Sequence, residues 1–176
     1  MLQLDSYLEI AKSAALLAGA YIKDQQNKDL EIILNEGRDI KLQVDVDAEK
    51  IIKDHLISKS SFPILAEESG ASNELNELYW VVDPLDGTSN FLRNIPISCV
   101  SIALMKDLDP ILGVIFDFNN DDLYVGDCTK NISTINNKEI NVSDIQQKKD
   151  AILITGLPHG TDYSNNALNK MIADMQ

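Results

Sequence analysis

The sequence predicts a layered α+β protein, because helical and strand-like segments fall into separate blocks along the chain. Apolar residues first recur every three or four positions, which is typical of one long amphipathic helix over residues 4–26. They are Leu4, Leu8, Ala11, Ala15, Ala18 and Ile22. Later, short apolar stretches between residues 79 and 126 alternate with turn residues, as in consecutive antiparallel strands. With 176 residues, 44% of them hydrophobic, the chain suits one domain, or one domain and part of a second.

The segments that follow the first helix are predicted to form a strand pair, a second helix and a short strand. Residues 30–34 and 40–44 would pair through "NEGRD", because apolar and polar residues alternate along the second segment. Helical spacing returns over residues 46–59. The stretch "ILAEESG" (64–70) then indicates a short strand that ends in an acidic loop. Gly19 in the first helix is expected to permit close packing.

The middle of the chain is predicted to be rich in strands. The polar segment 129–143, "TKNISTINNKEINVS", is expected to be a turn-rich connection between layers. The strands before it are predicted at residues 79–82, 97–105, 111–116 and 122–126.

The last part of the chain is predicted to open a second layer. "AILIT" (151–155) has the pattern of a buried strand, and residues 162–175 have that of a helix. We therefore divide the chain into an N-terminal α+β subdomain, residues 1–145, and the start of a C-terminal α/β subdomain, residues 146–176.

The net charge of −13 argues against a nucleic-acid partner or an anionic membrane surface. No stretch approaches the roughly 18 apolar residues of a membrane span, and the N-terminus lacks the basic region of a secretory signal. Cys99 and Cys128 lack CxxC spacing, so reduced thiols are expected. These features predict a cytoplasmic protein.

Carboxylates gather at the ends of three apolar segments. Asp45 follows "IKLQV", Glu67 and Glu68 follow "ILA", and Asp83 and Asp86 follow "WVV". Strand ends are rigid positions on which sites are commonly built. Because no cysteine or histidine cluster accompanies these carboxylates, they suit a hard cation with oxygen ligands, which is Mg²⁺ or Mn²⁺ before Zn²⁺.

The stretch "DPLDGT" explains how two aspartates could share a cation. Pro84 favours an extended Asp83, so the chain is expected to turn immediately after the strand. That turn would bring both aspartate carboxylates and the Leu85 carbonyl to one side. Gly87 would permit a tight backbone, and Thr88 would be the N-cap of a helix whose N–H groups attract an anion such as phosphate.

Each feature taken singly also has an ordinary structural explanation. "DP" and "DG" usually mark surface turns, "EE" is usually a solvated pair, and Asp45 alone would be a strand end or helix cap. His55 and His159 lack a partner pattern and are predicted to be structural. A structural Ca²⁺ turn would need the D-x-[DN]-x-[DN]-G spacing, which is absent from this stretch. The ordinary explanations leave the conjunction and order of the motifs unexplained.

That conjunction resembles the inositol monophosphatase superfamily of metal-dependent, lithium-sensitive phosphatases. "DPLDGTSNF" is similar to the family signature, an "EE" pair follows an upstream strand, and Asp39, Asp45 and Glu49 match its D-x5-D-x3-E pattern. The resemblance covers essentially the whole chain. It implies the layered α/β sandwich of the inositol monophosphatase/fructose-1,6-bisphosphatase type, with its C-terminal layer incomplete.

The resemblance also implies metal ligands. Glu67, Asp83 and the Leu85 carbonyl would hold a first ion, and Asp83 and Asp86 a second. The cofactor would be Mg²⁺, with Mn²⁺ as a substitute and Li⁺ as an inhibitor. The family's later "WD" motif, whose aspartate completes the second site, has no match, since the only tryptophan is Trp80.

Catalytic and substrate-binding roles carry over in the same way. Thr88, hydrogen-bonded with Asp45, would orient and help deprotonate the attacking water, with Glu68 supporting the site from nearby. Asp86 and the N–H groups of Gly87 and Thr88 would contact the phosphorylated substrate.

The expected activity is hydrolysis of a small phosphomonoester, such as an inositol phosphate, a nucleoside 3′,5′-bisphosphate or a sugar phosphate, and a homodimer is expected. Where the family's early motif has "VT", this chain has Lys41 and Leu42, so a hydroxyl is lost. The alternative is a non-catalytic module that binds metal or phosphate. A phosphate-release assay separates the two.

Overall fold

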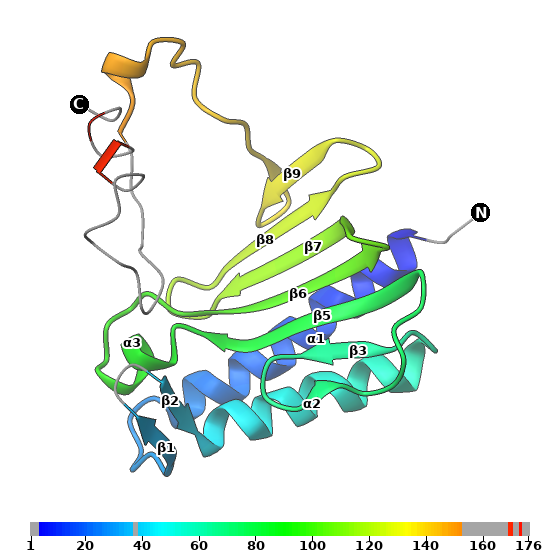
Figure 1. The fold of residues 1–176 in the computed structure, drawn as a ribbon, viewed down its shortest axis with the longest axis vertical. Coiled ribbons are helices and arrows are strands. Elements are labelled where there is room, and N and C mark those ends of the chain that lie inside the picture. Colours follow the sequence, from blue (N-terminus) through cyan, green and yellow to red (C-terminus); the bar gives the residue numbers. More distant parts are fainter. Residues whose placement is uncertain (1–3, 37–38, 153–168, 171–172, 174–176) are drawn as a thin grey trace. The chain divides into compact units, whose positions relative to one another are not determined.

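A computed structural model describes residues 4–36, 39–152, 169–170 and 173 (Figure 1). The chain divides into two compact units, residues 1–140 and 141–176. The division predicted after residue 145 stays a prediction.

The first unit contains every α-helix and strand from α1 to β10. In chain order these are α1 (Leu4–Gln25), β1 (Ile32–Glu36), β2 (Asp39–Leu42), α2 (Gln43–Lys59), β3 (Ile64–Ala66), β4 (Gly70–Ala71), β5 (Leu78–Asp86), α3 (Thr88–Leu92), β6 (Cys99–Lys106), β7 (Asp109–Asp117), β8 (Asp122–Asp127), β9 (Ile132–Ile135) and β10 (Lys138–Glu139). Strands β1 and β2 form an antiparallel pair. The other eight strands form one sheet in the order β10-β9-β8-β7-β6-β5-β3-β4, in which only β3 and β5 run parallel.

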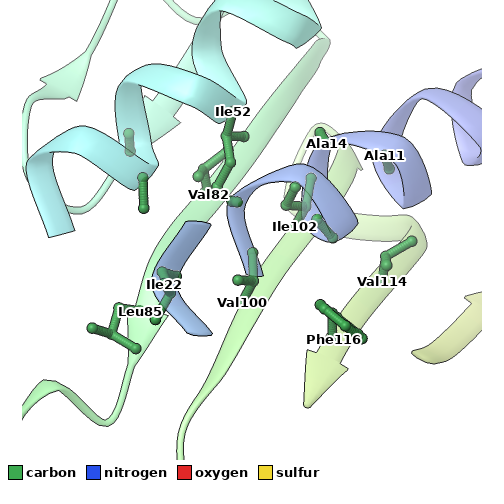
Figure 2. Packing of buried hydrophobic residues seen from close by; sticks show 14 of the residues in the cluster. Ala11, Ala14, Ile22, Ile52, Val82, Leu85, Val100, Ile102, Val114 and Phe116 are labelled. Atoms are coloured by element: carbon green, nitrogen blue, oxygen red, sulfur yellow. The ribbon is translucent and has the colours of Figure 1, made fainter. Parts of the chain in front are cut away.

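Helices α1 and α2 lie side by side on one face of this sheet, with α1 against β6 and β7 and α2 against β5 (Figure 1). Alternate residues of β6 and β7 point toward the helices, as the pleat of a strand requires. Figure 2 shows this core, where Ile22 and Ile52 of the helices pack near Val82, Val100 and Ile102 of the sheet. Full burial of such a side chain contributes roughly 1.5–3 kcal/mol to stability. The predicted layered α+β fold is confirmed.

The expected close packing at Gly19 is also confirmed. A Cβ atom at this position would lie 2.3 Å from the Phe116 ring. The absence of a side chain therefore lets α1 approach β7.

The second predicted strand and helix have different boundaries in the structure. The strand was expected to continue to residue 44, but β2 ends at Leu42 and α2 begins at Gln43. The cause is Asp45, whose Oδ2 accepts the Leu42 N–H at 2.6 Å and so satisfies a free donor at the helix start. Asp45 therefore lies in the first turn of α2, not after a strand.

The polar segment 129–143 was predicted to be a turn-rich connection between layers, and this prediction is wrong. The segment forms the hairpin β9–β10, which extends the sheet. Asn136 and Asn137 between the two strands have φ of 48° and 64°. Two consecutive residues with positive φ make the tight turn that suits the twist of paired strands. The "NN" pair was the signal for this hairpin.

In the second unit, the structure describes a short 3₁₀ turn, Lys148–Asp150. Ala151 and Ile152 are exposed and carry no strand, contrary to the strand predicted at 151–155, whose remainder lies outside the described residues. Of the helix predicted at 162–175, the described residues 169, 170 and 173 are helical. Among the described residues, no helix is long and apolar enough to span a membrane.

Candidate active site

The end of β5 carries the two aspartates of "DPLDGT". Asp83 pairs with Ser101 of β6 and Asp86 with Cys99, so β5 has one residue more than β6 in this interval. Pro84 has no N–H to donate to the ladder, which favours a bulge at this position. The expected turn directly after Asp83 is therefore corrected to a bulge within a strand that runs to Asp86.

Gly87 connects β5 to the short helix α3. Its φ is +90°, and a Cβ atom would lie 2.7 Å from the Ile97 carbonyl oxygen. Gly87 occupies the N-cap position, whereas Thr88 is the first helical residue, so the prediction that Thr88 is the N-cap is wrong. The Thr88 side chain therefore does not cap α3.

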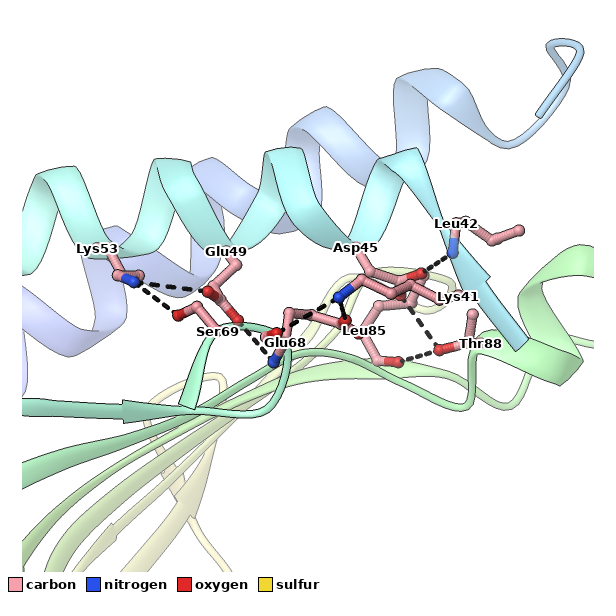
Figure 3. Close-up of polar contacts among 9 residues, drawn as sticks. All are labelled: Lys41, Leu42, Asp45, Glu49, Lys53, Glu68, Ser69, Leu85 and Thr88. Carbon is pink, nitrogen blue, oxygen red and sulfur yellow. Dashed lines mark hydrogen bonds and ion pairs between the residues drawn. The ribbon is translucent and has the colours of Figure 1, made fainter. Parts of the chain in front are cut away.

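The Thr88 hydroxyl faces two oxygen acceptors from different elements (Figure 3). Its Oγ1 lies 3.2 Å from Asp45 Oδ1 of α2 and 3.1 Å from the Leu85 carbonyl oxygen of β5. One hydroxyl has one proton and donates to one of these acceptors at a time. The predicted Thr88–Asp45 hydrogen bond is present.

Asp45 is 1% exposed. Burial raises its pKa to about 6, and the negative charges of Glu68 and Glu67 add to this rise, while the hydrogen bonds from Leu42 and Thr88 oppose it. A carboxylate with this pKa is ionised above about pH 6, and it can accept a proton in the neutral range.

Glu67 and Asp83 lie at the ends of two parallel neighbouring strands. Ala66 of β3 is in register with Val82 of β5, and the Glu67 N–H donates to the Val82 carbonyl oxygen at 3.1 Å. The next residue along the chain is an acid in both cases, Glu67 directly after β3 and Asp83 within β5. The pKa of Asp83 is raised to about 8. Burial is the largest cause, and the hydrogen bond to Glu67 and the negative charges of Glu67 and Asp86 add to the rise.

Glu68, the residue after Glu67, is held by contacts with α2 and β2 (Figure 3). Its N–H donates to Glu49 Oε2 at 2.9 Å, and its carboxylate forms an ion pair with Lys41 of β2. Lys53 lies 3.6 Å from Glu49 Oε1 and donates to Ser69 Oγ at 2.7 Å. Two lysines therefore neutralise the acids on this side.

The sequence interpretation missed the part that Lys41 plays in this cluster. It treated position 41 only as a departure from the family's motif. The available signal was a lysine in the strand that leads into Asp45. Asp39, which was matched to the same motif, belongs to β2, and its side chain lies outside the described part of the chain.

Asp86 is exposed at the rim of a cavity of about 400 Å³. Gly87, Asn90, Ser98 and Asp117 line other parts of this cavity. Within the described ranges, no three Asp, Glu, His or Cys side chains converge as the ligands of one metal ion. The ligand set available around Asp83 is thus carboxylate pairs together with the Leu85 carbonyl.

Comparison with known proteins identifies the class to which this fold and site belong. The model of the Inositol monophosphatase family matches residues 3–173. The chain therefore belongs to the inositol monophosphatase family.

Individual relatives agree with this assignment. The chain is 37% identical over 164 residues to "Fructose-1,6-bisphosphatase/inositol-1-monophosphatase" of Aquifex aeolicus, covering 90% of this chain and 61% of that protein. It is 38% identical over 162 residues to "Inositol-1-monophosphatase" of Synechocystis, covering 89% of this chain and 55% of that protein. The chain thus spans little more than half the length of these relatives.

Solved structures share the fold. The extragenic suppressor protein suhB of Bartonella henselae superposes with a TM-score of 0.84 and 31% identity, covering 95% of this chain and 67% of that one. The inositol monophosphatase of Anabaena gives 0.71 and 34%, covering 84% and 53%.

Proposed function

We propose that the protein hydrolyses a small phosphomonoester with the help of a divalent metal ion. The observation that carries this proposal is the pair Glu67 and Asp83, two adjacent acids at neighbouring strand ends. Among the described residues, no lysine, arginine or histidine forms an ion pair with either carboxylate. Acids placed together without a protein cation are suited to an external one.

The donors at this position fit Mg²⁺ or Mn²⁺. Two carboxylates and the Leu85 carbonyl are hard oxygen ligands, and Mg²⁺ commonly keeps several waters in its remaining positions. The Leu85 carbonyl oxygen lies 3.1 Å from Thr88 Oγ1, and it is left free for an ion when the Thr88 hydroxyl donates to Asp45 instead. When bound, such an ion neutralises phosphate charge and lowers the pKa of water.

Asp45 and Thr88 supply the proton path. In this proposal the attacking water donates to Thr88 Oγ1, which in turn donates to Asp45 Oδ1, 3.2 Å away. Asp45 is ionised at neutral pH, because its pKa is raised only to about 6. Thr88 thus orients the water, and Asp45 holds the Thr88 proton in the direction that transfer requires.

The phosphate would lie at the start of α3. Among the described turn and loop hydrogen bonds, none has the Gly87 or the Thr88 N–H as its donor. Asp86 lies beside them and would contact the substrate, or a second ion shared with Asp83. Similarity to a fructose-1,6-bisphosphatase/inositol-1-monophosphatase and to an inositol-1-monophosphatase favours inositol phosphates and sugar phosphates as the substrate class.

The test is phosphate release from a panel of phosphomonoesters with Mg²⁺. We expect turnover that requires the metal and is lost in Asp83→Asn, provided that circular dichroism shows the variant to be folded. Undiminished turnover by this variant would contradict the role given to Asp83.

A non-catalytic metal- or phosphate-binding module is the second candidate. The observation that favours it is the small ligand set, since no three acids converge within the described ranges. This candidate predicts Mn²⁺ binding without turnover of any substrate on the panel.

A further inference from the structure

Lys41 of β2 is, among the described residues, the cation that forms an ion pair with Glu68. Its Nζ forms an ion pair with Glu68 Oε2 and lies 3.4 Å from the Glu68 carbonyl oxygen. The two side chains are 29% and 14% exposed, so the pair is largely shielded from water. Shielding strengthens the pair, because screening by solvent and salt is weaker there.

Lys41 is also close to the other acids of the cluster. Its pKa is raised, first by the hydrogen bond to Glu68, with the charges of Glu68, Glu49 and Asp45 adding to the rise against the effect of burial. The ammonium is therefore fully charged at neutral pH. Because both of its contacts are to Glu68, it is engaged with the protein and is poorly placed to hold a substrate phosphate.

We propose that Lys41 is an internal counter-charge of the site, which keeps the Glu68 carboxylate out of the metal's ligand set and lowers the affinity of the site for divalent cations. This inference rests on the proposed function. Lys41 is a positioning residue in this account, because it acts through Glu68 and has no contact with the reacting atoms.

The consequence for metal binding has an unusual sign. If Lys41 only supported the fold, its removal would weaken metal binding. A lysine that opposes the metal's charge would do the reverse, because its loss leaves the site more negative and frees Glu68 to approach the ion. Lys41→Met should therefore bind Mn²⁺ more tightly.

Calorimetric titration with Mn²⁺ at fixed pH and low salt measures this effect without turnover. We expect the Mn²⁺ Kd of Lys41→Met to fall by at least about threefold, the order of a nearby unit charge acting on a divalent ion through water. Lys41→Arg should stay near the parent value. Lys106→Met is the matched control. This substitution removes the same charge at the opposite end of β5, where Lys106 pairs with Leu78.

Glu68→Gln provides a second, independent arm. It leaves the Lys41 ammonium without its partner, so we expect weaker Mn²⁺ binding. The double variant Lys41→Met/Glu68→Gln should lose the gain of Lys41→Met and return toward the parent Kd. This arm tests the inference even if Lys41→Met folds poorly.

The outcomes separate the inference from the proposed function. Mn²⁺ binding by the parent, together with unchanged or weaker binding by Lys41→Met or tighter binding by Glu68→Gln, would overturn the inference alone. An absence of Mn²⁺ binding by the parent chain would overturn the proposed function and the inference with it.

Discussion

The environment of Asp83 favours a bound cation or a proton, although the Leu85 N–H donates one hydrogen bond to its carboxylate. Its pKa is raised from 3.8 to about 8, so the folded chain holds a proton that the unfolded chain releases. The contribution of this group to stability is complete below pH 3.8 and is lost as the pH rises toward 8. We expect the Tm of the metal-free protein to fall over this range.

Asp83→Asn should flatten this dependence, because an amide has no proton to lose. In thermal unfolding with a chelator, the variant should have a higher Tm than the parent at pH 8 and a similar one at pH 4. Asp109→Asn, at the exposed start of β7, serves as the control. Parallel Tm curves for Asp83→Asn and the parent would contradict the assigned pKa.

Thr88 is the residue through which the proton path is tested. Thr88→Val keeps the shape of the side chain and removes the hydroxyl, so kcat should fall by about 10²–10³ with a smaller change in KM. Thr88→Ser keeps the Oγ and should retain most of the activity. If Thr88→Val turned over at the parent rate, the path from water to Asp45 would be wrong.

The residues of the site differ in how far the sequence could predict them. Asp45, Glu67, Asp83 and Thr88 were recognised from motif order, and the structure brings them to one end of the sheet. The ion pair of Lys41 with Glu68 joins β2 to the turn after β3. Such a contact depends on how separate elements pack, which a linear pattern does not contain.

At the scale of elements, the connection from β5 to α3 determines where the site groups point. Gly87→Ala would place a Cβ atom 2.7 Å from the Ile97 carbonyl oxygen at a φ of +90°. We expect this substitution to lower the free energy of unfolding by about 1–3 kcal/mol, as measured by urea denaturation. Gly113→Ala is the control, because a Cβ there meets nothing within 4 Å. Equal effects of the two substitutions would argue against a strained connection.

The elements that were predicted best have strong periodicity. Helix α1 repeats its buried residues at helical spacing, and strands β6 and β7 bury alternate residues. The start of α2 and the β9–β10 hairpin were misjudged, because each depends on a local feature that outweighs periodicity. In α2 this feature is the capping carboxylate of Asp45, and in the hairpin it is the left-handed pair Asn136–Asn137.

For the first unit as a whole, the layered arrangement of two helices on a sheet followed from the order of the predicted segments. The parallel pairing of β3 with β5 did not, although it is this pairing that sets Glu67 beside Asp83. Parallel strands need a connection that crosses over, and the intervening β4 was not predicted from its two residues.

The central claim is that Glu67, Asp83 and the Leu85 carbonyl bind one divalent ion. Calorimetric titration with Mn²⁺ at pH 7 in buffers of different ionisation enthalpy tests it most directly. Because metal-free Asp83 is protonated at this pH, we predict one site whose binding releases about one proton, and whose heat disappears in Asp83→Asn but not in Asp109→Asn. Binding without proton release, or equal binding by Asp83→Asn, would contradict the account.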